Sequence, residues 1–147
     1  MKKEYGRSMI EMLGVLAIIG VLSIGGLAGY TMAMNRHRAN TVLDYVSRCV
    51  VVAQTNGDGS TLQTGNCAKI LGEDKPSFLS ADAAIQTGSK GASIVVKGTA
   101  ATEAIADALA NRDTTAIKVA KDSAGSGAFT VTFVGAGKGF TSEKPAS

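Results

Sequence analysis

The side chains that most often carry chemistry in proteins are few and scattered in this chain of 147 residues. His37 is the only histidine, so neither a multi-histidine metal site nor a serine or cysteine nucleophile with a nearby histidine base is expected. Cys49 and Cys67 are 18 positions apart, a spacing that matches neither a CxxC redox motif nor a four-ligand zinc pattern. We therefore expect no catalytic residue, no metal site, no cofactor and no enzymatic activity.

Two glycine-rich segments look like ligand loops, but each lacks a required residue. Residues 135–139 (GAGKG) place Lys138 in a setting similar to a phosphate loop, but glycine follows it where serine or threonine is needed. Residues 56–60 (NGDGS) alternate oxygen-bearing side chains as calcium loops do, but Cys67 stands at the position of the bidentate glutamate. We interpret both segments as turns or surface loops.

The two cysteines are interpreted as a single disulfide, Cys49–Cys67, if the part of the chain that holds them lies outside the cytoplasm. Two free buried thiols are the alternative. In the chain-entropy description, closing a loop of this size contributes about 3 kcal/mol to stability.

The charges are dispersed, with a formal net charge of only +3. The one basic cluster, residues 36–38 (RHR), is interpreted as an anchor to lipid headgroups, with nucleic-acid contact as the alternative. Other basic side chains are either ordinary surface charges or contacts to DNA and other anions, namely Lys90, Lys97, Lys118 and Lys121. Three acidic side chains are interpreted as a solvated face, with an adhesion or subunit contact as the alternative; they are Glu103, Asp107 and Asp113.

The first structural element is built around an uncharged run. From Met12 to Met34, 23 consecutive residues carry no charge, which is long enough to span a bilayer. A cleaved secretory signal, an ordinary anchor and the first part of a longer helix are three interpretations. The run exceeds the apolar core of about 7 to 15 residues in a secretory signal. Glu11, near its start, would also be costly in lipid, on the order of 2.5 to 3.5 kcal/mol.

The helical pattern continues beyond this run. No proline interrupts it, and apolar residues recur at steps of three and four, at Ala39, Val42, Leu43, Val46, Val50 and Ala53. This spacing predicts one helix from Arg7 to Ala53, about 70 Å long, hydrophobic all round in its first half and amphipathic in its second. Residues 54–59 end it with turn-forming side chains.

The remaining sequence predicts a small head with few large apolar residues. The fold class is α+β, with a long N-terminal helix, transmembrane and then amphipathic, packed on a small antiparallel β-sheet. The expected elements are a connector at 65–72 with a short helical piece, a turn at 73–76, strands at 92–97, 115–120 and 128–134, a helix at 102–111 capped by Thr102, a hairpin loop at 121–127 and a loose tail at 135–147.

A short basic leader ends in Gly6 (MKKEYG), and RSMIEML then places Glu11 at the start of the apolar run. With this start, the N-terminal third of the chain resembles the type IV pilin and type II secretion pseudopilin family. The resemblance implies cleavage by a prepilin peptidase between Gly6 and Arg7, and methylation of the new N-terminus at Arg7. It divides the chain into a leader (1–6), a stem helix (7–53) and a head (54–147).

This resemblance also implies a function. The protein would be an inner-membrane precursor that assembles into an extracellular pilus-like filament, a helical homopolymer used in adhesion, motility, DNA uptake or conjugation. Its partners would be other copies, the prepilin peptidase, the assembly machinery and a host surface or DNA. A minor pilin, or a pseudopilin of a type II secretion or competence apparatus, is an alternative within this class. A membrane-anchored binding protein that never polymerises is the alternative from another class.

Glu11 has a specific place in this scheme. A carboxylate in an apolar segment needs a partner, and the free amine of Arg7 on an incoming subunit would neutralise it when the helices pack side by side. The alternatives are that Glu11 lies at headgroup level or pairs with Arg7 of its own helix at i, i+4 spacing.

Overall fold

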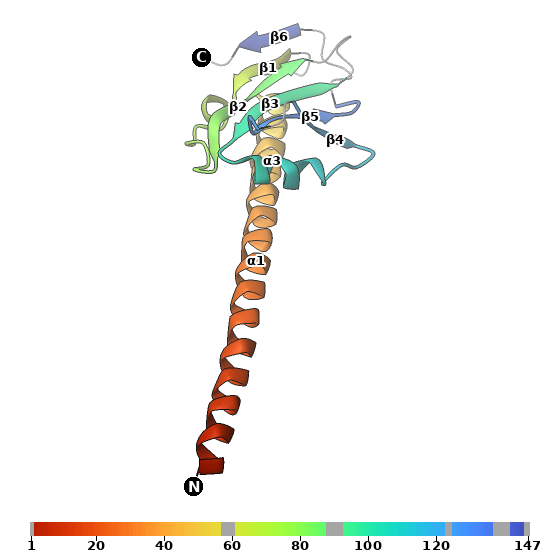
Figure 1. The fold of residues 1–147 in the computed structure, drawn as a ribbon. Coiled ribbons are helices and arrows are strands. Elements are labelled where there is room, and N and C mark those ends of the chain that lie inside the picture. Colours follow the sequence, from red (N-terminus) through yellow and green to blue (C-terminus); the bar gives the residue numbers. More distant parts are fainter. Residues whose placement is uncertain (1, 57–60, 88–92, 123–124, 137–141, 146–147) are drawn as a thin grey trace. The chain divides into compact units, whose positions relative to one another are not determined.

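The computed structural model describes residues 2–56, 61–87, 93–122, 125–136 and 142–145, and the side chains of 8–56, 62–86, 93–122 and 125–136. Two compact units are present, residues 1–34 and residues 35–147. The described residues of the first unit, 2–34, are helical throughout. The elements in chain order are α1 (Lys2–Thr55), β1 (Thr61–Asn66), α2 (Cys67–Leu71), β2 (Leu79–Thr87), β3 (Ile94–Ala100), α3 (Glu103–Ala110), β4 (Ile117–Lys121), β5 (Ala128–Phe133) and β6 (Ser142–Pro145) (Figure 1).

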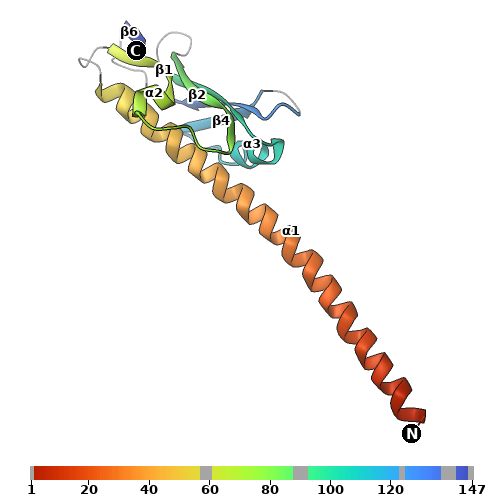
Figure 2. The same cartoon turned by 90° about the vertical axis from the view of Figure 1, so that its left-hand side faces the viewer.

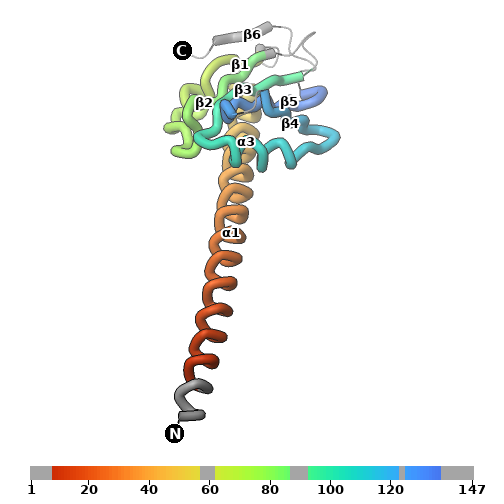
Figure 3. Tube along the Cα trace, in the orientation of Figure 1, coloured from red at the N-terminus to blue at the C-terminus, as the bar shows by residue number. Residues whose placement is uncertain are grey.

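The second unit is built on one sheet with the strand order β4-β5-β3-β2-β1-β6. Every neighbouring pair from β4 to β1 is antiparallel. β6 pairs in parallel with β1, with Thr61 opposite Ser142. Helix α3 lies in the connection from β3 to β4, and the path then returns along β5, as the tube in Figure 3 shows.

The core of this unit lies between the sheet and the second half of α1 (Figure 2). Of the six apolar helix positions singled out from the sequence, five are buried and Leu43 is partly buried, so the predicted amphipathic face is confirmed. The sheet side of the core is formed by every second residue of the strands, because successive side chains of a strand point to opposite faces. The buried strand residues include Leu79, Ile85, Ile94, Val96, Phe129 and Val131.

The fold class predicted from the sequence is confirmed as a long N-terminal helix with a small, mainly antiparallel sheet. The strands expected at 92–97, 115–120 and 128–134 correspond to β3, β4 and β5, and the helix expected at 102–111 corresponds to α3. Thr102 occupies the N-cap position of α3, but its side chain makes no capping hydrogen bond. The short helical piece expected in the connector is α2.

Three strands were not expected. β1 takes in residues 65–66, which were assigned to the connector loop, and β2 has no counterpart among the predicted elements. The prediction of a loose tail at 135–147 is wrong for residues 142–145, which form β6. Their backbone is ordered by hydrogen bonding to the edge of β1, and such pairing depends little on which side chains the strand carries.

Candidate functional site

The apolar surface of the first unit is uncovered within the chain. Its large hydrophobic side chains from Met9 to Met32 are between 53% (Ile19) and 74% (Ile24) exposed. The described part of the chain has one helix long and apolar enough to cross a membrane, with a mean hydropathy of 2.2 over its most apolar window. An apolar surface of this extent is stable only when lipid or other protein covers it.

The residues expected to act in processing and assembly lie in the first turns of α1. The backbone is helical through Gly6, Arg7 and Glu11, and Glu11 is exposed. The side chain of Arg7 is outside the described side chains, so the predicted pairing with Glu11 stays a prediction. The helix begins at Lys2, within the expected leader, and nothing in the backbone interrupts it at Gly6.

Cys49 and Cys67 form the disulfide that the sequence predicts. Their Cα atoms are 5.5 Å apart and both residues are fully buried. Cys49 lies on the core face of α1, one turn after Tyr45, and Cys67 is the first residue of α2. The bond therefore fixes the segment after α1 to the helix. No other cysteine exists in the chain.

A partly buried pair of hydrogen bonds connects the segments that carry the two cysteines. Tyr45 Oη donates to Asp82 Oδ1 at 3.0 Å, and the backbone N–H of Ala68 donates to Asp82 Oδ2 at 2.9 Å. Burial, together with the hydrogen bond to Asp82, raises the pKa of Tyr45 well above its usual range. The phenol therefore stays a donor, and the carboxylate of one strand residue holds α1 and the first turn of α2.

The acidic side chains interpreted as a solvated face are exposed and form ion pairs. Lys121 Nζ lies 2.7 Å from both Glu103 Oε1 and Asp107 Oδ1. Those two carboxylates, Asp107 first, raise the pKa of Lys121, and Lys121 in turn lowers the pKa of Glu103. Lys121 of β4 therefore offsets one of the two negative charges of α3.

Asp113 is held by the backbone as well as by a lysine. The N–H of Val119 donates to Asp113 Oδ1 at 2.8 Å, and Lys118 Nζ lies 3.2 Å from Oδ2. These contacts, the backbone hydrogen bond first, lower the pKa of Asp113. Asp113 thus closes the turn that leads into β4.

The described residues contain no group of three or more histidine, cysteine or carboxylate side chains that would hold a metal ion. His37 is exposed on α1. The segments that look like calcium and phosphate loops fall largely on residues 57–60 and 137–139, outside the described residues, as does Lys90.

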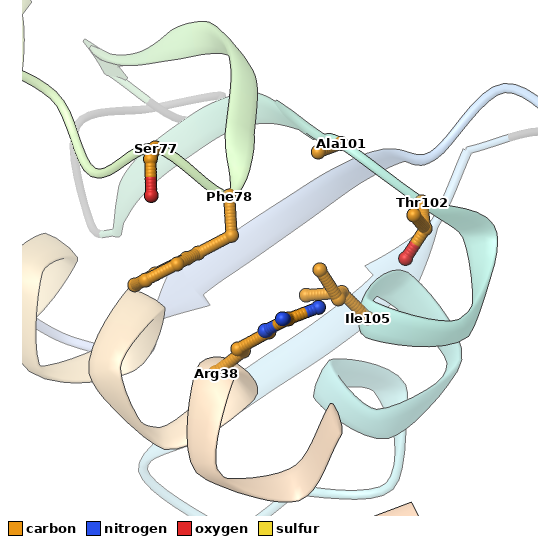
Figure 4. A pocket seen from close by; sticks show the side chains of 6 residues that line it. All are labelled: Arg38, Ser77, Phe78, Ala101, Thr102 and Ile105. Carbon is orange, nitrogen blue, oxygen red and sulfur yellow. The ribbon is translucent and has the colours of Figure 1, made fainter. Parts of the chain in front are cut away.

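A surface pocket of about 180 Å³ lies where α1, the segment before β2 and the start of α3 meet. Its lining residues are Arg38, Ser77, Phe78, Ala101, Thr102 and Ile105 (Figure 4). The sequence did not indicate this pocket, because Arg38, Ser77 and Thr102 come from three separate segments and no spacing rule links them. The only signal in the sequence was the basic cluster at 36–38.

Comparison of the chain with protein-family models, curated proteins and solved structures finds no match.

Proposed function

We propose that this protein is a structural, non-enzymatic subunit of an extracellular type IV pilus-like filament. The observation that carries the proposal is a contrast within α1. Residues 39–53 bury their apolar face in the head, whereas the large apolar side chains from Met9 to Met32 are uncovered within the chain. In the proposed scheme lipid covers this surface in the precursor, and neighbouring helices cover it in the filament.

Two further features support the proposal. The leader-like start ending in Gly6 and the single carboxylate at Glu11 match the prepilin pattern. The disulfide Cys49–Cys67 fits a head that folds in an oxidising compartment outside the cytoplasm. We infer that the precursor resides in the inner membrane and is cleaved between Gly6 and Arg7, and that Arg7 is the residue methylated.

A pseudopilin of a type II secretion or competence apparatus shares every one of these features. A membrane-anchored binding protein would use the same apolar helix without polymerising. The physical difference is whether protein or lipid covers the side chains of residues 9–32 in the final state.

Imaging of sheared surface material with an antibody to the head tests the filament assignment. Labelled filaments are the expected result. Recovery of the protein only as a monomeric membrane species, with the assembly machinery intact, would contradict it.

Intact-mass analysis tests processing independently. A mature chain that has lost residues 1–6 is expected. A mature chain beginning near Gly29 would establish an ordinary signal peptide and exclude the stem helix.

A further inference from the structure

The pocket at Arg38 gathers three polar side chains that have no partner within the described part of the protein. Arg38 is partly buried, yet neither its guanidinium nor the hydroxyls of Ser77 and Thr102 make a hydrogen bond or ion pair with a described residue. By contrast, Arg48, Lys118 and Lys121 each bind a carboxylate. A guanidinium without a counter-charge in the protein keeps its donors available for an external anion.

The geometry of the pocket selects the kind of anion. Figure 4 shows Arg38 extending from α1 toward Ile105, below Phe78, with Ser77 and Thr102 at the rim of the same space. The guanidinium offers a planar set of donors that matches phosphate, and the two hydroxyls add donors from other directions. The pocket is smaller than the 300 to 1,000 Å³ typical of sites for drug-sized ligands, which favours a single phosphate group.

The surrounding charges allow an anion to approach. Arg36 and His37 are exposed on the same stretch of helix, and the first acidic residue after them is Asp44. Glu103, next to Thr102, has its carboxylate bound by Lys121. Arg36 and Arg38 therefore place two positive charges on this stretch of α1.

The position of Arg38 in the chain identifies the source of the phosphate. It follows Met34, the last apolar residue before the basic cluster, by four positions, which is about 6 Å of helix. When that run spans a bilayer, Arg38 lies at the depth of the lipid headgroups. We propose that this pocket binds the phosphate of an anionic phospholipid headgroup. The inference requires membrane insertion but not filament assembly, so either proposal can fail without the other.

The test titrates phosphatidylglycerol into the full chain in non-ionic detergent micelles and compares two arginine variants. Arg38→Gln is expected to weaken lipid binding about tenfold, because a charged hydrogen-bonding group is lost from the pocket. Arg36→Gln removes the same charge from an exposed position outside the pocket, and is expected to change binding by no more than about twofold. Equal losses in both variants would show diffuse charge attraction and overturn the proposal.

A second variant tests the contribution of the pocket without changing its charge. Ser77→Ala with Thr102→Val keeps the net charge, and we expect it to weaken binding about threefold. Unchanged binding would overturn the proposal even if Arg38→Gln failed to fold, which the disulfide content and circular dichroism spectrum of each variant report. The last measurement is a titration of inorganic phosphate, which tests whether free phosphate competes with the lipid. Little competition is expected, and binding as tight as that of the lipid would assign the pocket to free phosphate and refute the lipid assignment.

Discussion

Tyr45 Oη lies 3.0 Å from Asp82 Oδ1, and this hydrogen bond joins the core face of α1 to the middle of β2. Tyr45 is only 2% exposed, so water does not readily replace the contact. Because Asp82 also accepts the N–H of Ala68, one carboxylate connects a helix, a strand and the segment that carries Cys67.

Replacing Tyr45 by phenylalanine removes the donor and leaves one carboxylate oxygen without its protein partner. We expect the free energy of unfolding to fall by about 1 kcal/mol, the usual net value of such a bond. Urea unfolding of the full chain in detergent micelles measures the change. Tyr30→Phe, at an exposed tyrosine of the first unit, is the matched control and should leave the stability of the head unchanged. Equal effects of the two substitutions would show that the bond contributes nothing.

The disulfide is expected to stabilise the head by about 3 kcal/mol through closure of its loop. Reduced and oxidised wild type are the matched comparison, since both keep the two buried sulfur atoms. Cys49→Ala with Cys67→Ala should be destabilised and should no longer respond to reductant. If reductant leaves the urea midpoint of the wild type unchanged, the loop-closure explanation is wrong.

Gly127 and Gly125 both have positive φ, but only Gly127 lies against another segment. A Cβ on Gly127 would lie 2.5 Å from the carbonyl oxygen of Ala100, whereas one on Gly125 would meet nothing within 4 Å. Gly125→Ala therefore costs only the backbone strain, about 1 to 2 kcal/mol. Gly127→Ala must also push β3 and β5 apart, and is expected to cost about 2 kcal/mol more. Urea unfolding compares the two, and equal losses would contradict the contact.

Acid should weaken the head through Asp113. Because the folded state lowers the pKa of this carboxyl from its ordinary value of 3.8, the stabilisation is complete above that value and is lost as the pH falls through the lower folded-state pKa. Asp113→Asn should therefore destabilise the head at about pH 7 and flatten the decline in stability below about pH 4. Urea midpoints measured across this pH range provide the test. Asp74→Asn is the control, because Asp74 makes no hydrogen bond or ion pair with a described residue. The same flattening in both variants would show that Asp113 does not cause the loss of stability in acid.

Glu11→Gln tests the assembly role. A neutral amide enters lipid more easily than a carboxylate, so insertion and cleavage after Gly6 should persist. Polymerisation should fall sharply, because an amine buried without its counter-charge costs on the order of 3 to 5 kcal/mol per subunit. Precursor, cleaved subunit and sheared filament are quantified in parallel, with Glu73→Gln in the head as control. Normal filament yield in Glu11→Gln would leave this carboxylate as a residue tolerated at the headgroup boundary.

The sequence was sufficient for the elements whose apolar residues follow a clear period. The helical spacing from Ala39 to Ala53 and the alternation of Phe129, Val131 and Phe133 each identified an element that the structure contains. β2 was missed because alanine, serine and aspartate fill most of it, and these residues have low strand propensity. β1 and β6 were missed because neither TLQTGN nor SEKP contains an alternation of apolar residues, and backbone pairing by itself is not visible in a sequence.

Among the candidate sites, too, some could be predicted from the sequence and others could not. The cysteine pair could be predicted because the chain has only two cysteines, whereas Asp82 and the Arg38 pocket could not. Asp82 is one of several aspartates, and only the approach of Tyr45 and Ala68 distinguishes it. The lining of the pocket comes from residues 38, 77–78 and 101–105, which only the folded chain brings together.

The parallel pairing of β1 with β6 has a consequence for the order in which the head is completed during folding. Thr61 and its partner Ser142 are 81 positions apart, whereas β4 and β5 are joined by a short connection. Contacts between distant segments carry the larger loop-closure cost and form late. The outer edge of β1 therefore stays unpaired until residues 142–145 have reached the rest of the folding head. During that interval the open strand edge can pair with another incompletely folded copy, a hazard that ends once β6 is in place.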